Sequence, residues 1–150
     1  MCSVFTISIA GLSILAPAAG GAEEDRHGIS LFIGGVTETG DDRETGFALG
    51  AEYEYRPYSM IGIGGLVELA TGDVRDAVTL LPLTFHPFGG LALKAAPGAE
   101  ISDGDAEFAF RLGISYEIPV GPFSIAPEFN SDLVTGDWTY VYGVSFGIGF

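Results

Sequence analysis

Cysteine and basic residues are scarce in this sequence, and each scarcity excludes a class of protein. The single cysteine, Cys2, lies at the N-terminus, so the rest of the chain has no disulfide framework. Lysine and arginine together number 6 against 20 aspartates and glutamates, which gives a formal net charge of −14. Phosphate backbones are bound by basic patches, and we therefore expect no nucleic-acid partner.

Sequence signatures of catalysis are also missing. The chain contains no His-Glu-x-x-His motif and no phosphate-binding loop, and its Gly-x-Ser-x-Gly pattern, at residues 143–147, lies inside an expected strand and not at the strand-to-helix turn of a nucleophile elbow. A lipid-modifying membrane enzyme needs a nucleophile beside a base. The two histidines lie before the first expected strand, at His27, and at a tight turn, at His86, and neither is expected beside a serine at the outer rim. We expect no catalytic residue and no cofactor, and keep a lipid-modifying enzyme as the last alternative.

Long apolar runs are confined to the N-terminus. Beyond it, no stretch reaches the ~18 apolar residues of a membrane helix, although the mean hydropathy is high at +0.37. Residues 1–22 contain an apolar core followed by an alanine- and glycine-rich stretch that ends at Ala22. This pattern predicts a cleaved secretory signal. A short polar arm is expected over residues 23–28, and a single domain over residues 29–150.

Short alternating apolar runs, separated by turn-forming residues, make up that domain. Glycine, at 23 residues, disfavours long helices. Pro82 lies inside the fourth run and lacks an amide donor, which predicts a bulge. The pattern predicts an all-β protein with eight strands. These strands are expected at residues 29–37, 45–56, 59–70, 76–86, 90–100, 106–118, 122–131 and 137–150.

Bulky and small side chains alternate along the expected strands. From Trp138 to Phe150, every even position is large and apolar and most odd positions are small, and successive side chains of a strand point to opposite faces. A lipocalin-like barrel would turn the bulky face inward, but an eight-stranded interior has little room. The bulky face is therefore predicted to meet lipid, in an antiparallel up-and-down transmembrane β-barrel. Phe32 and Leu66 are exceptions that fall on the small-residue face.

Two kinds of connection alternate between the expected strands. Short turns rich in proline and glycine lie around residues 56–58, 86–90 and 118–122. The other four connections are acidic and span residues 37–44, 71–75, 102–105 and 134–137. We assign Asp132, just before the last of them, to the same acidic rim. This alternation indicates two different rims, as in a barrel with one periplasmic and one external side.

Charged residues on the small-residue face are predicted to point into the lumen. We expect an ion network of Glu52, Lys94, Arg111 and Glu128, with an ion pair between Arg111 and Glu128 and with Lys94 nearby. Buried charges must be paired, because an isolated one is costly. The network is interpreted as a polar plug, and a gated narrow pore is the alternative. The remaining lumen-facing charges are Glu54, Glu68, Glu107 and Glu117.

With these features, residues 28–150 resemble the small eight-stranded outer-membrane barrels of the OmpA-like, OmpX-like and opacity-protein type. The resemblance rests on the leader, the strand count, the alternation, the short turns of one rim and the C-terminal segment 142–150. It implies a location in the cell outer membrane, among its lipids and lipopolysaccharide. A C-terminal aromatic residue belongs in that family to the signal read by the barrel-assembly machinery, and Phe150 matches it.

The expected role is structural or surface-interacting, in a porin-like barrel whose lumen is plugged. A narrow pore for small solutes remains the runner-up. The acidic loops are interpreted as a solvated rim without a specific metal site. Carboxylate oxygens bind hard cations, so a diffuse layer of divalent cations that bridges these loops to lipopolysaccharide phosphates is a further hypothesis.

Overall fold

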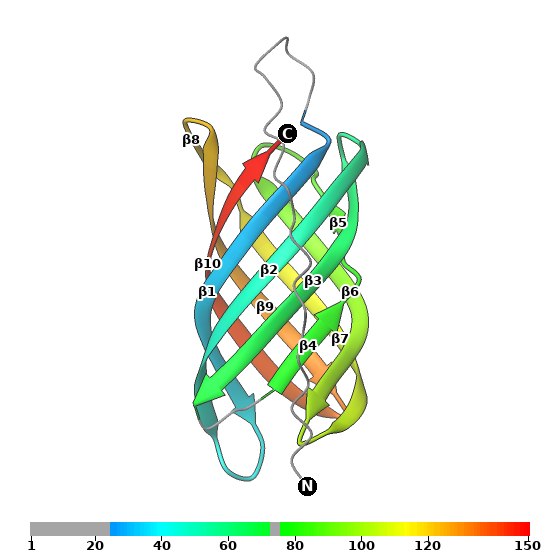
Figure 1. The fold of residues 1–150 in the computed structure, drawn as a ribbon, viewed down its shortest axis with the longest axis vertical. Coiled ribbons are helices and arrows are strands. Elements are labelled where there is room, and N and C mark those ends of the chain that lie inside the picture. The colour runs from blue at the N-terminus through cyan, green and yellow to red at the C-terminus, as the bar shows by residue number, and fades with distance from the viewer. Residues whose placement is uncertain (1–24, 73–75) are drawn as a thin grey trace, which may run out of the picture.

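The computed structural model describes residues 25–72 and 76–150 and consists of antiparallel strands (Figure 1). Within these ranges no helix is long and apolar enough to cross a membrane. The predicted signal at residues 1–22 lies outside the described residues. The strands are β1 (His27–Thr39), β2 (Glu44–Tyr58), β3 (Ile61–Gly72), β4 (Asp76–Leu80), β5 (Leu83–Phe85), β6 (Leu91–Ser102), β7 (Asp105–Tyr116), β8 (Ile118–Val120), β9 (Phe123–Val134) and β10 (Asp137–Gly149).

The sheet closes on itself into a barrel. β1 pairs with β2 on one side and with β10 on the other, and β10 also pairs with β9. β4 and β5 form one barrel strand with a break, and so do β7 and β8, so ten segments give eight strands around the barrel. The predicted closed, eight-stranded antiparallel barrel is confirmed (Figure 1).

The break between β4 and β5 lies where proline predicted an irregularity. Pro82 has no amide hydrogen to donate to a neighbouring strand. Around it, the amide of Leu81 donates to the carbonyl of Pro97 at 2.9 Å, and the carbonyl of Pro82 accepts from Gly64 at 3.0 Å. Both neighbouring strands thus remain bonded across the break, and the barrel wall stays closed.

Bulky apolar side chains cover the outside of the barrel. On β7, Leu112 is 50% exposed, whereas two residues on the other face of the strand are buried. Ala109 is 1% exposed and Arg111 is fully buried. Phe146 on β10 is likewise 50% exposed. An apolar outer wall around a lumen of small and polar residues is the surface of a barrel solvated by lipid, as the alternation predicted.

Phe32 and Leu66, the exceptions in the sequence pattern, lie inside the lumen. Phe32 packs with Val36, Ala48 and Val141, and Leu66 belongs to a second buried apolar cluster. Gly34 makes room for the first cluster, because a Cβ atom there would lie 2.6 Å from the Phe32 ring. The lumen therefore contains apolar layers as well as charges, and small neighbouring residues make space for them.

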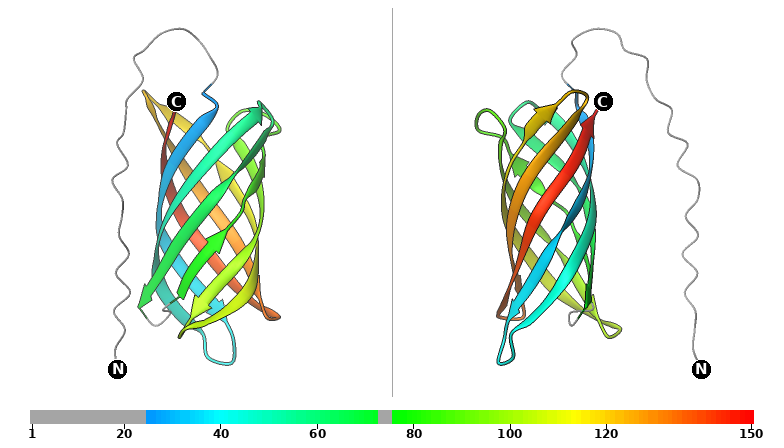
Figure 2. Two further views of the ribbon diagram at one scale, coloured as in Figure 1. Left: turned by 45° about the vertical axis from the view of Figure 1, so that its right-hand side comes forward. Right: turned by 90° about the vertical axis from the view of Figure 1, so that its left-hand side faces the viewer.

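The two rims differ in shape, as Figure 2 shows. The turns between β2 and β3, β5 and β6, and β8 and β9 lie at one rim, together with the C-terminus; we call it the turn rim. The opposite rim, the loop rim, carries the acidic connections, among them residues 40–43. Two of these connections are two-residue turns with positive φ angles, at residues 103–104 and 135–136. Such turns follow the twist of a hairpin.

Candidate functional site: the charged lumen

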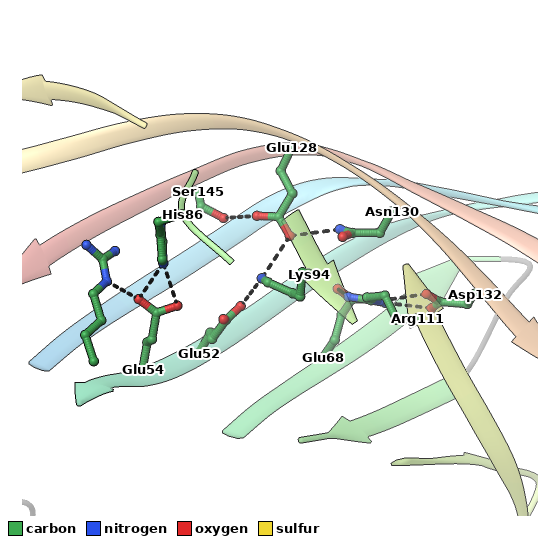
Figure 3. Close-up of polar contacts among 11 residues, drawn as sticks. Glu52, Glu54, Glu68, His86, Lys94, Arg111, Glu128, Asn130, Asp132 and Ser145 are labelled. Atoms are coloured by element: carbon green, nitrogen blue, oxygen red, sulfur yellow. Dashed lines mark hydrogen bonds and ion pairs between the residues drawn. The ribbon is translucent and has the colours of Figure 1, made fainter. Parts of the chain in front are cut away.

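Three groups of charged side chains follow one another along the barrel axis (Figure 3). The rim group lies nearest the turn rim, the central group follows it, and the Arg111 clamp lies farthest toward the loop rim. Their members come from β2, β3, β6, β7 and β9 and from the turn after β5. The rim group is Glu54, Arg56 and His86; the central group is Glu52, Lys94 and Glu128; the Arg111 clamp is Glu68, Arg111 and Asp132.

Arg111 makes two bidentate ion pairs. Its Nε and Nη2 atoms donate to the two Asp132 oxygens at 2.6 and 2.7 Å. Its Nη2 and Nη1 atoms donate to the two Glu68 oxygens at 2.8 and 3.0 Å. The planar guanidinium matches two carboxylates in this way, which lysine could not do.

The clamp joins opposite walls of the barrel. Arg111 and Asp132 are directly paired on the neighbouring strands β7 and β9, whereas Glu68 lies on β3, which does not adjoin either strand. The side chain of Arg111 is fully buried, and those of Glu68 and Asp132 are 5% and 3% exposed. Removing one partner of such a buried pair leaves uncompensated charge, which costs about 3–5 kcal/mol. The clamp therefore fixes the cross-section of the lumen and fills it.

Lys94 is the centre of the next group. Its ammonium pairs with Glu52 and lies 3.6 Å from an oxygen of Glu128. Glu128 also accepts a hydrogen bond from Asn130 Nδ2 at 2.8 Å and another from Ser145 Oγ at 2.7 Å. The central group thus combines two carboxylates with one ammonium, and neutral donors satisfy the second carboxylate.

The rim group surrounds Glu54. Arg56 pairs with Glu54, and His86 Nε2 lies 3.2 Å from the same carboxylate. Arg56 also reaches Glu117, at 3.4 Å, on the segment between β7 and β8. These side chains line the mouth of the lumen at the turn rim.

A cavity of about 270 Å³ occupies the turn-rim half of the lumen. Members of the rim and central groups line it, whereas Glu68, Arg111 and Asp132 do not. Its lining also includes turn-rim residues such as Gly121 and Pro122. The lumen is therefore open toward the turn rim and closed at the clamp, and we call this cavity the vestibule.

The structure places the four residues of the predicted ion network inside the barrel, but with different partners. Lys94 joins Glu52 and Glu128, whereas Arg111 bonds Glu68 and Asp132. The predicted Arg111–Glu128 pair is therefore wrong. The assignment of Asp132 to the acidic rim is also wrong, because β9 continues to Val134 and buries Asp132 at 2% exposure.

Comparisons with known proteins rest on structure, since no protein-family model and no curated protein matches this sequence. The crystal structure of Ail, the attachment invasion locus protein of Yersinia pestis, superposes with a TM-score of 0.62 at 13% identity, over 83% of this chain and 97% of that one. Neisserial surface protein A gives a TM-score of 0.53 at 8% identity, over 83% and 97% of the two chains.

A transmembrane β-barrel of de novo design also matches, with a TM-score of 0.57 at 9% identity, over 84% of this chain and 98% of that one. Ail has in addition been crystallised in complex with the heparin analogue sucrose octasulfate. At identities this low, the likeness shows a shared fold. The chain has the fold of the small transmembrane β-barrels, to which designed and natural examples both belong.

The clamp predicts a large effect of a single substitution. Arg111→Met removes the guanidinium and leaves two buried carboxylates facing each other. We expect the free energy of unfolding to fall by about 3–5 kcal/mol. Urea titration in detergent micelles, followed by the fluorescence of Trp138, measures it. Arg43→Met, at an exposed position of the loop rim, is the control and should change stability by no more than about 0.5 kcal/mol.

A triple variant separates pairing from packing. Replacing all three charges, by Glu68→Gln, Arg111→Met and Asp132→Asn, should recover a substantial part of the loss, since no unpaired charge remains. Equal stability of Arg111→Met and Arg43→Met would contradict a structural role for the clamp.

Proposed function

We propose that this protein is an integral outer-membrane β-barrel with a structural or surface-interaction role, without catalysis, and with a lumen that does not conduct. The observation that carries the proposal is the Arg111 clamp, which crosses the lumen of a barrel whose outer wall is apolar. The clamp favours a plug over the alternative of a narrow pore. The vestibule ends at the clamp, and the buried apolar clusters fill further parts of the lumen.

Export and assembly are part of the same proposal. Residues 1–22 would direct the chain out of the cytoplasm, and Phe150 would be read by the barrel-assembly machinery. The contacts of Phe150 support a position at the closing seam. Its amide donates to the carbonyl of His27 at 2.8 Å, and its carbonyl accepts from the amide of His27 at 3.0 Å. The two rings stack with centroids 5.7 Å apart. The terminal residue thus completes the pairing of β10 with β1.

The contacts of the two histidines support a non-catalytic role. His27 Nδ1 lies 2.7 Å from the hydroxyl of Tyr53, and the His27 ring stacks on the ring of Phe150. His86 lies at the turn rim against Glu54. In the part of the chain that the structure describes, neither imidazole has a hydrogen bond to a serine. A hydrolase of the serine type requires such a bond between base and nucleophile.

Single-channel recording tests the plug. The purified barrel in a planar lipid bilayer should show no steady conducting steps at neutral pH, because the clamp and the apolar clusters block the lumen. Steady open steps of the wild-type barrel would favour the pore. Release of fatty acids from lipid vesicles by the same preparation would instead favour the enzyme.

The loop rim supports an interaction with divalent cations in the lipopolysaccharide layer. Carboxylate oxygens of Glu38, Asp76 and Glu100 all lie within 4.8 Å of one another. They come from the end of β1, the start of β4 and the end of β6. Hard cations take carboxylate oxygens, and a cation held there could also contact a phosphate. A polyanion of the kind bound by Ail does not suit this rim on its own, since acids predominate in a chain of net charge −14.

Removal of divalent cations tests this interaction. Saturating Ca²⁺ or Mg²⁺ should raise the unfolding temperature of the barrel in micelles, and a chelator should reverse the rise, because a ligand of the folded state stabilises it by mass action. Glu100→Gln should abolish the rise, whereas Glu117→Gln, which removes one carboxylate at the opposite rim, should preserve it. A wild-type barrel that is insensitive to chelation would contradict the proposal.

A further inference from the structure

The outer wall changes character where β10, β1 and β2 reach the turn rim. Cross-strand pairing places two rows of outward side chains there. The row closer to the middle of the barrel is Ile148, Ile29 and Tyr53. The row at the rim is Phe150, His27 and Tyr55. Hydrocarbon offers no partner to an N–H or O–H donor. The imidazole and the tyrosine hydroxyls therefore mark the level at which lipid headgroups begin.

His27 lies between aromatic rings on both neighbouring strands. Its ring centroid is 5.7 Å from that of Phe150 and 5.1 Å from that of Tyr55, and its Nδ1 atom lies 2.7 Å from the Tyr53 hydroxyl. A neutral imidazole accepts at one nitrogen and donates from the other. With Nδ1 accepting from Tyr53, Nε2 carries the hydrogen, and within the described ranges this nitrogen has no hydrogen-bond partner.

A β-bulge adds a third tyrosine to this surface. The register of β2 with β3 shifts between Tyr55, which lies opposite Ile63, and Tyr58, which lies opposite Ile61. Both isoleucines are exposed on the outer wall. In a regular strand, two residues three positions apart would point to opposite faces, so the bulge is what turns Tyr58 outward. We call the surface formed by Phe150, His27, Tyr53, Tyr55 and Tyr58 the aromatic face.

A cation lies beside the aromatic face. Arg26 is exposed, and its carbonyl accepts a hydrogen bond from the amide of Arg56 at 2.7 Å. Unlike Arg56, Arg26 forms no ion pair with any described residue. The described acid next to it in sequence, Asp25, lies over Gly149 and lines the vestibule instead. An anion that binds at Arg26 and His27 would displace no carboxylate of the described chain.

The acidic loops do not oppose such an anion, because they lie at the other end of the barrel (Figure 2). A strand of 12 residues, such as β6, spans about 30 Å along the axis of a barrel with strands tilted by about 40°. The Debye length at physiological ionic strength is about 8 Å. Repulsion by the loop rim is therefore screened at the turn rim.

We propose that the aromatic face and Arg26 bind the phosphate of an acidic phospholipid in the leaflet at the turn rim. The phosphate oxygens accept from His27 Nε2 and from the Arg26 guanidinium, and the acyl chains continue along Ile29 and Ile148. Two observations favour a lipid over a protein partner. The aromatic face is continuous with the lipid-facing wall, and its donors lie at the boundary of that wall. The proposal rests on the membrane location proposed above.

Lipid titration in nanodiscs tests the proposal. The ¹⁵N-labelled barrel is placed in phosphatidylcholine discs that contain increasing fractions of phosphatidylglycerol. Both lipids carry a phosphodiester, but only phosphatidylglycerol has a net negative charge. We expect the Nε2 resonance of His27 and the amide resonance of Arg26 to shift saturably with its fraction. Inorganic phosphate added to discs of phosphatidylcholine alone should not produce these shifts.

Matched variants locate the site. Arg26→Gln should lower the affinity for phosphatidylglycerol relative to phosphatidylcholine roughly fivefold, as expected for one arginine at an anionic lipid surface. His27→Phe keeps an aromatic ring between Phe150 and Tyr55 but removes both ring nitrogens, and should also weaken the selectivity, measured at the Arg26 amide. Arg43→Gln, at the loop rim, changes the net charge as Arg26→Gln does and should leave the selectivity unchanged.

Three results would overturn the proposal. The first is a folded wild-type barrel in nanodiscs whose resonances do not depend on phosphatidylglycerol. The second is an equal loss of selectivity in Arg43→Gln and Arg26→Gln, which would mean attraction by net charge alone. The third is the same set of shifts with inorganic phosphate, which would show a site for the free anion. A barrel that does not enter the discs would instead contradict the membrane location, and this proposal with it.

Discussion

A strand in hydrocarbon has no water to bond, so each of its amide and carbonyl groups needs a partner within the protein. An eight-stranded sheet meets this requirement only when its first and last strands pair. Here β1 and β10 do so along their length, and His27 and Phe150 end the seam with reciprocal bonds. Closure also determines which side chains each face can carry, because one face of every strand must then meet lipid and the other must share a narrow lumen.

The lumen shows the consequence of that division. Because bulky residues occupy the outside, small residues leave room inside for Phe32, Leu66 and the charged groups. Charges in so confined a space must be paired, and the Arg111 clamp pairs them across the barrel. The clamp closes the loop-rim half, while the turn-rim half stays open as an acidic vestibule. One barrel thus has two chemically different ends.

Local pattern was enough to predict the strands, their facing and the irregularity at Pro82, because alternation with period two is a property of each strand alone. Ion-pair partners depend instead on how strands are staggered across the barrel, which no local pattern contains. Glu68 and Arg111 lie on strands that are not neighbours. Asp132 was misplaced because an acidic residue before a turn resembles a loop residue, although β9 extends past it. The vestibule could be predicted neither from the alternation nor from the turn residues, because its extent depends on the position of the clamp in the lumen.

The direction of the bulky side chains is the claim on which this account depends most directly. Nitroxide labels at Leu112 and Phe146, each 50% exposed on the outer wall, can be tested in lipid bilayers for collision with oxygen and with a water-soluble nickel chelate. The account predicts strong oxygen collisions and weak chelate collisions at both positions, and the reverse at a label on Thr135 in the loop rim. Labels at Leu112 and Phe146 that are shielded from oxygen would place these side chains in an enclosed core and contradict the account.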